Sequence, residues 1–149
     1  MKKLLIAALL VVSVSASSIA QDLSSVDRKA MGNFEAMYAG ASGVDWTSTG
    51  KFTKASFVQN EKKMDVFYNL DGDFVAATTQ LKVDEIPASI KKTLEKRYSD
   101  YVVKEAFQYK SYDEVTYFIS VENQKEDIVL KVTEGLLSVY SSVDKNRVL

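Results

Sequence analysis

Few side chains in this sequence could carry out chemistry on their own. The 149 residues include no histidine and no cysteine, and these residue types supply most general bases, nucleophiles and transition-metal ligands of proteins. Histidine-containing triads, Cys-x-x-Cys pairs and His-Glu-x-x-His zinc motifs are therefore excluded. The sequence also lacks the glycine-rich phosphate loops of nucleotide-binding proteins. We expect no catalytic residue, no metal site and no cofactor.

Carboxylates are the reactive groups that remain. A converging pair could cleave a glycoside, but most acidic residues lie in predicted turns or on outward strand faces, where solvation accounts for them. Asn69-x-Asp71-Gly72-Asp73 resembles the start of a calcium loop, yet no distal glutamate stands at the required spacing. The segment is more typical of a hairpin turn. A hydrolase that uses carboxylates alone stays open, as an alternative to the two binding functions given at the end of this section.

Aromatic residues are the best candidates for a binding surface. The chain has eight Tyr, seven Phe and one Trp, most of which we expect in the core, Trp46 included. Phe67, Phe118 and Tyr140 instead stand among polar residues on the outward side of predicted strands. If those strands are neighbours, the three rings would form an apolar patch of the kind that marks a partner site. Scattered surface aromatics are the alternative.

The first twenty residues have the pattern of a signal peptide. Two lysines precede an apolar run from Leu4 to Val14, and small residues follow up to Ala20. We expect cleavage after about Ala20, with a second possible site after Ala16. The apolar run is too short for a membrane span, which needs about 20 residues. The sequence thus predicts a signal peptide at 1–20 and export to the periplasm, with the extracellular space left open.

The remaining residues, 21–149, suit one small domain. Without Lys2 and Lys3 the chain has 17 basic and 20 acidic residues, so it offers no basic surface to nucleic acid. No later stretch is long enough to span a membrane. The lack of cysteine excludes disulfides, and burial alone must hold the fold. We expect another periplasmic or secreted protein as the partner, while the oligomeric state stays open.

Hydrophobic periodicity predicts two helices. Apolar residues recur at helical spacing from Leu23 to Tyr38, with Ser24 and Asp27 resembling a capping box. A second helix is predicted from Pro87 to about Ser99, with apolar residues at Ile86, Ile90, Leu94 and Tyr98. Its other face is strongly charged, which is typical of a solvated helix face.

Seven segments have the character of strands joined by turns. Alternating patterns and β-branched residues indicate strands at 52–59, 64–70, 74–81, 101–110, 115–123, 127–132 and 136–143. Asn60, Gly72 and Gly135 stand in the hairpin turns. The fold class is therefore α+β, in which helices pack on one face of an antiparallel sheet.

The two halves of the chain show the same pattern. The strand before Asp71-Gly72 and the strand before Glu134-Gly135 share an acidic start and the same apolar alternation. We therefore interpret the domain as tandem half-repeats, about 23–82 and 84–143, each a helix followed by an antiparallel meander. A chance similarity between two amphipathic hairpins is the alternative.

Several segments together resemble a known family. They are Val44-Asp45-Trp46, the run from Val66 to Gly72, the helix start Ile86-Pro87-Ala88-Ser89-Ile90, and the exit Tyr98 to Tyr101. Between Phe34 and Tyr140 the chain is similar to PepSY-like periplasmic proteins, which share the β-lactamase-inhibitor-like fold. This resemblance implies helices on one sheet face and an open opposite face, and it brings no catalytic residue.

Two functions follow as hypotheses. The first is a non-enzymatic exported module that binds another protein, in the manner of an inhibitor that restrains an enzyme. The second is a carrier or sensor of a small apolar or peptide ligand, held between helices and sheet in a cavity lined by aromatics.

Overall fold

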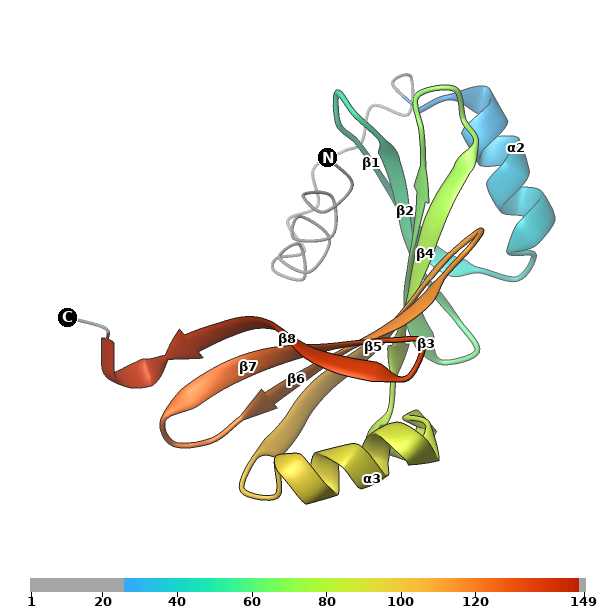
Figure 1. The fold of residues 1–149 in the computed structure, drawn as a ribbon. Coiled ribbons are helices and arrows are strands. Elements are labelled where there is room, and N and C mark those ends of the chain that lie inside the picture. Colours follow the sequence, from blue (N-terminus) through green and yellow to red (C-terminus); the bar gives the residue numbers. More distant parts are fainter. Residues whose placement is uncertain (1–25, 148–149) are drawn as a thin grey trace.

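The computed structural model describes residues 26–147 and has an α+β fold. Two α-helices and eight strands lie in this range, and the strands form one antiparallel sheet in chain order (Figure 1). The elements are α2 (Arg28–Met37), β1 (Ser42–Ser48), β2 (Thr53–Gln59), β3 (Lys62–Tyr68), β4 (Phe74–Leu81), η2 (Val83–Glu85), α3 (Ala88–Arg97), β5 (Val102–Ser111), β6 (Val115–Glu122), β7 (Glu126–Thr133), β8 (Leu136–Asp144) and η3 (Lys145–Arg147). The expected signal peptide lies outside the described residues.

Helix α2 begins at a side-chain cap. The Asp27 carboxylate accepts hydrogen bonds from the backbone N–H groups of Lys29 and Ala30, at 2.7 and 3.3 Å. This cap satisfies amides that have no partner within the helix. The helix therefore starts after Asp27, which is its N-cap and not the third helical residue of a capping box. Ser24, the other residue of the predicted box, lies outside the described residues. Met37, an apolar residue within the predicted helical stripe from Leu23 to Tyr38, is exposed.

Helix α3 matches its prediction closely. Pro87 stands at the N-cap, and Ile86, Ile90 and Leu94 are buried. Lys96 and Arg97 lie in the last turn, where positive charge complements the helix dipole.

Both helices cover the same face of the sheet. Ala77 and Leu81 lie on one side of β4, since strand residues four apart share a face. Ala77 belongs to the core beneath α2, which also includes Phe34, Phe57 and Val66. Leu81 packs against the core beneath α3, which includes Ile119 and Leu130. The expected packing on one sheet face is therefore confirmed.

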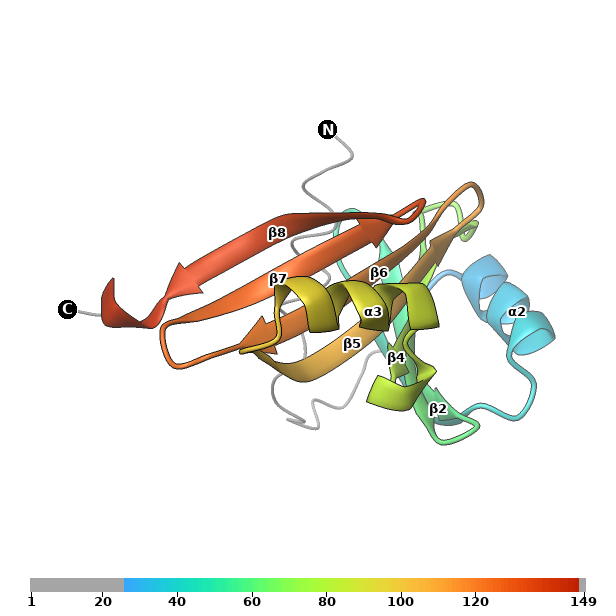
Figure 2. The same cartoon turned by 60° about the horizontal axis from the view of Figure 1, so that its bottom comes forward.

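The sheet bends sharply between its two halves. Figure 1 shows β1–β4 running at a steep angle to β5–β8, with α2 and α3 on the outer side of the bend, and the rotated view in Figure 2 agrees. A continuous ladder between β4 and β5, from Ala76 paired with Ser111 to Leu81 paired with Ala106, joins the halves. The face away from the helices thus lines the inside of the bend.

Seven of the strands lie where the sequence predicts them, within a few residues. β1 was not predicted, and the strand predicted for 64–70 ends at Tyr68, which leaves Leu70 exposed in the turn. Asn60 and Glu61 adopt positive φ in the β2–β3 turn, and Gly72 and Gly135 do so in later hairpins. Within residues 26–147 no helix is both long enough and apolar enough to cross a bilayer.

Candidate functional site

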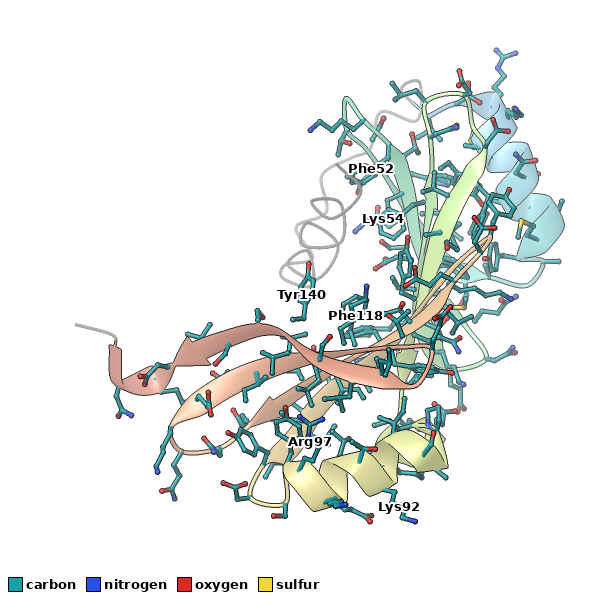
Figure 3. All side chains as sticks on the ribbon, in the orientation of Figure 1. Phe52, Lys54, Lys92, Arg97, Phe118 and Tyr140 are labelled. Atoms are coloured by element: carbon teal, nitrogen blue, oxygen red, sulfur yellow. The ribbon has the colours of Figure 1, made fainter. Side chains whose placement is uncertain are left out.

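The sheet face opposite α2 and α3 is the candidate binding surface, and we call it the inner face. Strand register defines its members. Lys54 on β2 pairs with Phe67 on β3, and Phe107 on β5 pairs with Phe118 on β6. Together with Phe52 and Tyr140, these side chains make up the central part of the inner face. Figure 3 shows Phe52, Lys54, Phe118 and Tyr140 projecting into the angle of the bend.

Phe67, Phe118 and Tyr140, predicted to form one patch, divide between two ring contacts. The condition for such a patch was that their strands be neighbours, but β3, β6 and β8 are not adjacent. Phe118 and Tyr140 do meet edge to face, with ring centroids 5.3 Å apart. Phe67 instead packs edge to face against Phe52, at 5.6 Å. The inner face therefore carries two aromatic pairs, one in each half of the sheet.

A β-bulge explains how Tyr140 meets Phe118 across β7. Val129 pairs with Ser141 and Leu130 with Val139, so Tyr140 is the extra residue of β8. An extra residue bends its strand and redirects its side chain. Here the Tyr140 ring lies against Phe118.

The rings of the inner face differ in exposure. Phe67 and Phe118 are only 5% and 3% exposed, so they form the floor of the surface and are not the exposed aromatics that the sequence suggested. Phe52, Phe107 and Tyr140 are half-buried. A partner would reach these three rings first, supported by the two buried ones.

Lys54 lies within the same surface and is unusual in its burial. It is 9% exposed, and it is the one charged residue among the buried residues of 26–147. Its cross-strand neighbours are Thr47 on β1 and Phe67 on β3. An amino group so placed adds a positive charge beside an aromatic floor.

Sequence reasoning did not identify Phe52, Lys54 or Phe107 as part of the site. Alternation within 52–59 separates Lys54 from Ala55 and Phe57, and so places Lys54 on the open face. A lysine on an open strand face is ordinarily solvated. Nothing local to the sequence indicates that Lys54 is only 9% exposed in the folded chain.

The segment from Asn69 to Asp73 is a hairpin turn, as predicted. The Asn69 side-chain oxygen accepts hydrogen bonds from the backbone N–H groups of Asp71 and Asp73, at 3.0 and 2.8 Å. Asp73 pairs with Lys29 at 2.6 Å, and this hydrogen bond lowers the pKa of Asp73 and raises that of Lys29. Across residues 26–147 no cluster of three or more metal-ligating side chains occurs.

A separate pocket lies between α2 and β1. Its volume is about 320 Å³, and the rings of Phe34, Tyr38 and Trp46 line it together with Met31 and Glu35. Phe34 meets Trp46 edge to face at 5.3 Å and stacks on Tyr38 at 5.4 Å. Trp46 is buried in the first core, as the sequence predicts.

Solved structures share this fold at low sequence identity. A DUF2874 family protein from Bacteroides uniformis has a TM-score of 0.70 at 16% identity, over 83% of this chain and 93% of the other. A protein assigned provisionally to the periplasm of Bacteroides eggerthii has a TM-score of 0.70 at 21% identity, over 80% of this chain and 88% of the other.

A third structure has the fold that the sequence resemblance implies, the β-lactamase-inhibitor-like (BLIP-like) fold. A BLIP-like protein from Bacteroides fragilis has a TM-score of 0.67 at 16% identity, over 80% of this chain and 86% of the other. The BLIP-like part of the predicted resemblance is thereby confirmed for the fold. No protein-family model and no curated protein sequence matches the chain.

Proposed function

We propose that this chain is an exported, non-enzymatic protein-binding module of the PepSY-like group, which restrains another periplasmic or secreted protein through its inner face. Both helices pack on the outer face, so no described element covers the opposite one. This uncovered face, with its two aromatic pairs, is the observation that carries the proposal. Aromatic side chains around a desolvated centre are typical of binding hot spots.

Two features of the sequence agree with this role. The expected signal peptide at 1–20 would deliver residues 21–149 to the periplasm, and the lack of histidine and cysteine fits a module that binds and does not catalyse. We also propose that the halves 23–82 and 84–143 are copies of one unit, since each consists of one helix and four strands. A bent sheet built of two units presents two similar surfaces to one partner.

Capture from a periplasmic extract of the native organism tests the proposal. We compare the mature wild-type chain with the double variant Phe52→Ser, Tyr140→Ser, because both rings are half-buried and can be changed without opening the core. Val139→Ser is the matched control, since Val139 is exposed on the same strand and lies on the other face. The partner should be lost from the double variant and retained by the control. Equal capture by all three proteins would contradict the inner face as the binding surface.

A second candidate function rests on the pocket between α2 and β1. Its volume and aromatic lining suit a small apolar ligand. Native mass spectrometry of freshly purified protein should then reveal a bound molecule, which Val44→Trp should displace by filling the pocket that Val44 lines. A ligand-free mass for the wild type would count against a carrier.

A further inference from the structure

Lys54 lacks the partner that a buried lysine normally has. Among residues 26–147 its side chain takes part in none of the ion pairs or hydrogen bonds that the structure contains. Its ammonium nitrogen is not among the buried polar atoms that lack a partner in this range, so the apolar stem is covered while the charged end still reaches water. The free protein therefore holds the charged end of Lys54 at the inner face without using it in an ion pair.

The nearest carboxylates by register do not neutralise it. Asp45 on β1 and Asp65 on β3 both pair with Ser56, which lies two residues beyond Lys54 on β2. Asp65 accepts a hydrogen bond from the Ser56 hydroxyl at 2.6 Å, and neither carboxylate forms an ion pair with Lys54. The two acids therefore leave the ammonium group available on the inner face.

Thr47 is the neighbour of Lys54 on β1, and on the β3 side Lys54 lies beside aromatic rings. Phe67 lies directly across the ladder, and Phe52, which contacts Phe67, precedes Lys54 by two residues. A positive charge bordered by rings is complementary to a carboxylate that has an apolar side chain beside it. Such an ion pair would be strong, since the surrounding rings exclude water from it.

We propose that Lys54 is the specificity-determining residue of the inner face, and that the partner is a protein whose docking segment presents an Asp or Glu to Lys54, with apolar residues on both sides. This inference rests on the proposed function and adds the chemistry of the partner. The aromatic pairs then receive the apolar residues, while Lys54 selects the segment that carries the acid between them. Truncation of one member of a desolvated charge pair weakens binding strongly.

Two displayed libraries of cyclic peptides test the proposal. Both vary the apolar residues around a central position, which is Asp in one library and Asn in the other. Each is selected against the mature wild-type chain, and the selected peptides are measured against Lys54→Met, Lys54→Arg and the control Lys92→Met. Lys92 is exposed on α3, on the far side of the sheet (Figure 3).

The Asp library should yield binders and the Asn library none of comparable affinity. Those binders should lose at least about tenfold in affinity with Lys54→Met, retain more of it with Lys54→Arg, and be unaffected by Lys92→Met. In addition, Lys54→Met should unfold at the same or a higher temperature than the wild type, because the change removes no ion pair and keeps the apolar stem. A lower unfolding temperature would assign Lys54 a structural role and overturn the inference.

The remaining outcomes separate this inference from the proposed function. Peptides whose affinity is unchanged by Lys54→Met but abolished by the double variant Phe52→Ser, Tyr140→Ser would overturn the role of Lys54. They would leave the inner face as the binding surface. Peptides whose affinity is unchanged in both variants would contradict the proposal that the inner face is the binding surface. Failure of both libraries to yield a binder would overturn the acidic partner.

Discussion

The hydroxyl group of Tyr68 is buried in the core beneath α2 without a hydrogen-bond partner among residues 26–147. Burial raises the pKa of this hydroxyl above its usual range, because the ionised form would lose its hydration. Tyr101 differs in this respect. Its hydroxyl donates a hydrogen bond to Glu126 at 2.5 Å, and this bond raises its pKa to about 12.

The same chemical change should have opposite effects at these two tyrosines. Tyr68→Phe removes an unsatisfied buried hydroxyl, so we expect the free energy of unfolding to rise by about 1 kcal/mol. Tyr101→Phe removes the donor to Glu126, and we expect that free energy to fall. Denaturant titration of both variants beside the wild type measures the two changes. A loss of stability in Tyr68→Phe would indicate that its hydroxyl has a partner after all.

The candidate site could be predicted only in part at the residue scale. Alternation along the strands correctly places Phe67 and Phe118 on the face away from the helices. Their low exposure and the contact of Phe67 with Phe52 depend on which strands pair and on how their side chains pack. These are long-range properties, which local periodicity does not contain.

At the scale of elements, the β3–β4 hairpin packs closely against the start of α2. Gly72 has φ of 77°, and a Cβ added there would lie 2.6 Å from the Asp27 carboxylate and 2.8 Å from the backbone nitrogen of Ala30. The amide group of Asn33 donates a hydrogen bond to the Gly72 carbonyl at 2.9 Å. Only glycine allows the turn to approach the helix cap so closely.

Gly72→Ala should therefore be far more damaging than the same change at Gly135. Gly135 also has positive φ, at 79°, but a Cβ there would meet nothing within 4 Å. We expect Gly135→Ala to cost about 1 kcal/mol for the backbone conformation alone. Gly72→Ala should cost about 3 kcal/mol, since the clash with the cap adds to that strain.

Thermal and denaturant unfolding of the two variants measure this difference. If both variants lost the same free energy of unfolding, the hairpin would be able to move away from α2 without penalty. The contact would then contribute little to stability. Far-ultraviolet circular dichroism should show that both variants keep the native secondary structure at low temperature.

Most elements could be predicted because their burial is periodic. Strand β7 alternates between buried and half-buried residues, the pattern of a strand with one covered face. β1 could not be predicted, because only Trp46 of its seven residues is buried and a register irregularity follows Ser42. As an edge strand that includes Gly43 and Asp45, it has little of the composition that indicates a strand.

At the scale of the whole molecule, the two cores lie on either side of the bend and share one ladder. The core under α2 includes Phe34 and Phe57, and the core under α3 includes Ile119 and Leu130. The β4–β5 ladder pairs residues 76–81 with residues 106–111 and covers a strand edge in each half. Each half alone is close to the size, roughly 60 residues, at which burial becomes marginal.

We therefore expect the halves to unfold as one cooperative unit. Trp46, the single tryptophan, lies in the first core and reports on that half by fluorescence. Leu130→Ala, in the second core, should lower the free energy of unfolding by about 3 kcal/mol and shift the Trp46 transition by the same amount. The cooperativity would be contradicted if, in Leu130→Ala, the circular dichroism signal were lost at a lower denaturant concentration while the Trp46 fluorescence transition stayed where it is in the wild type. If the inner face binds a partner as we propose, a sheet that unfolds as one unit would present the two aromatic pairs and Lys54 already ordered, which favours affinity.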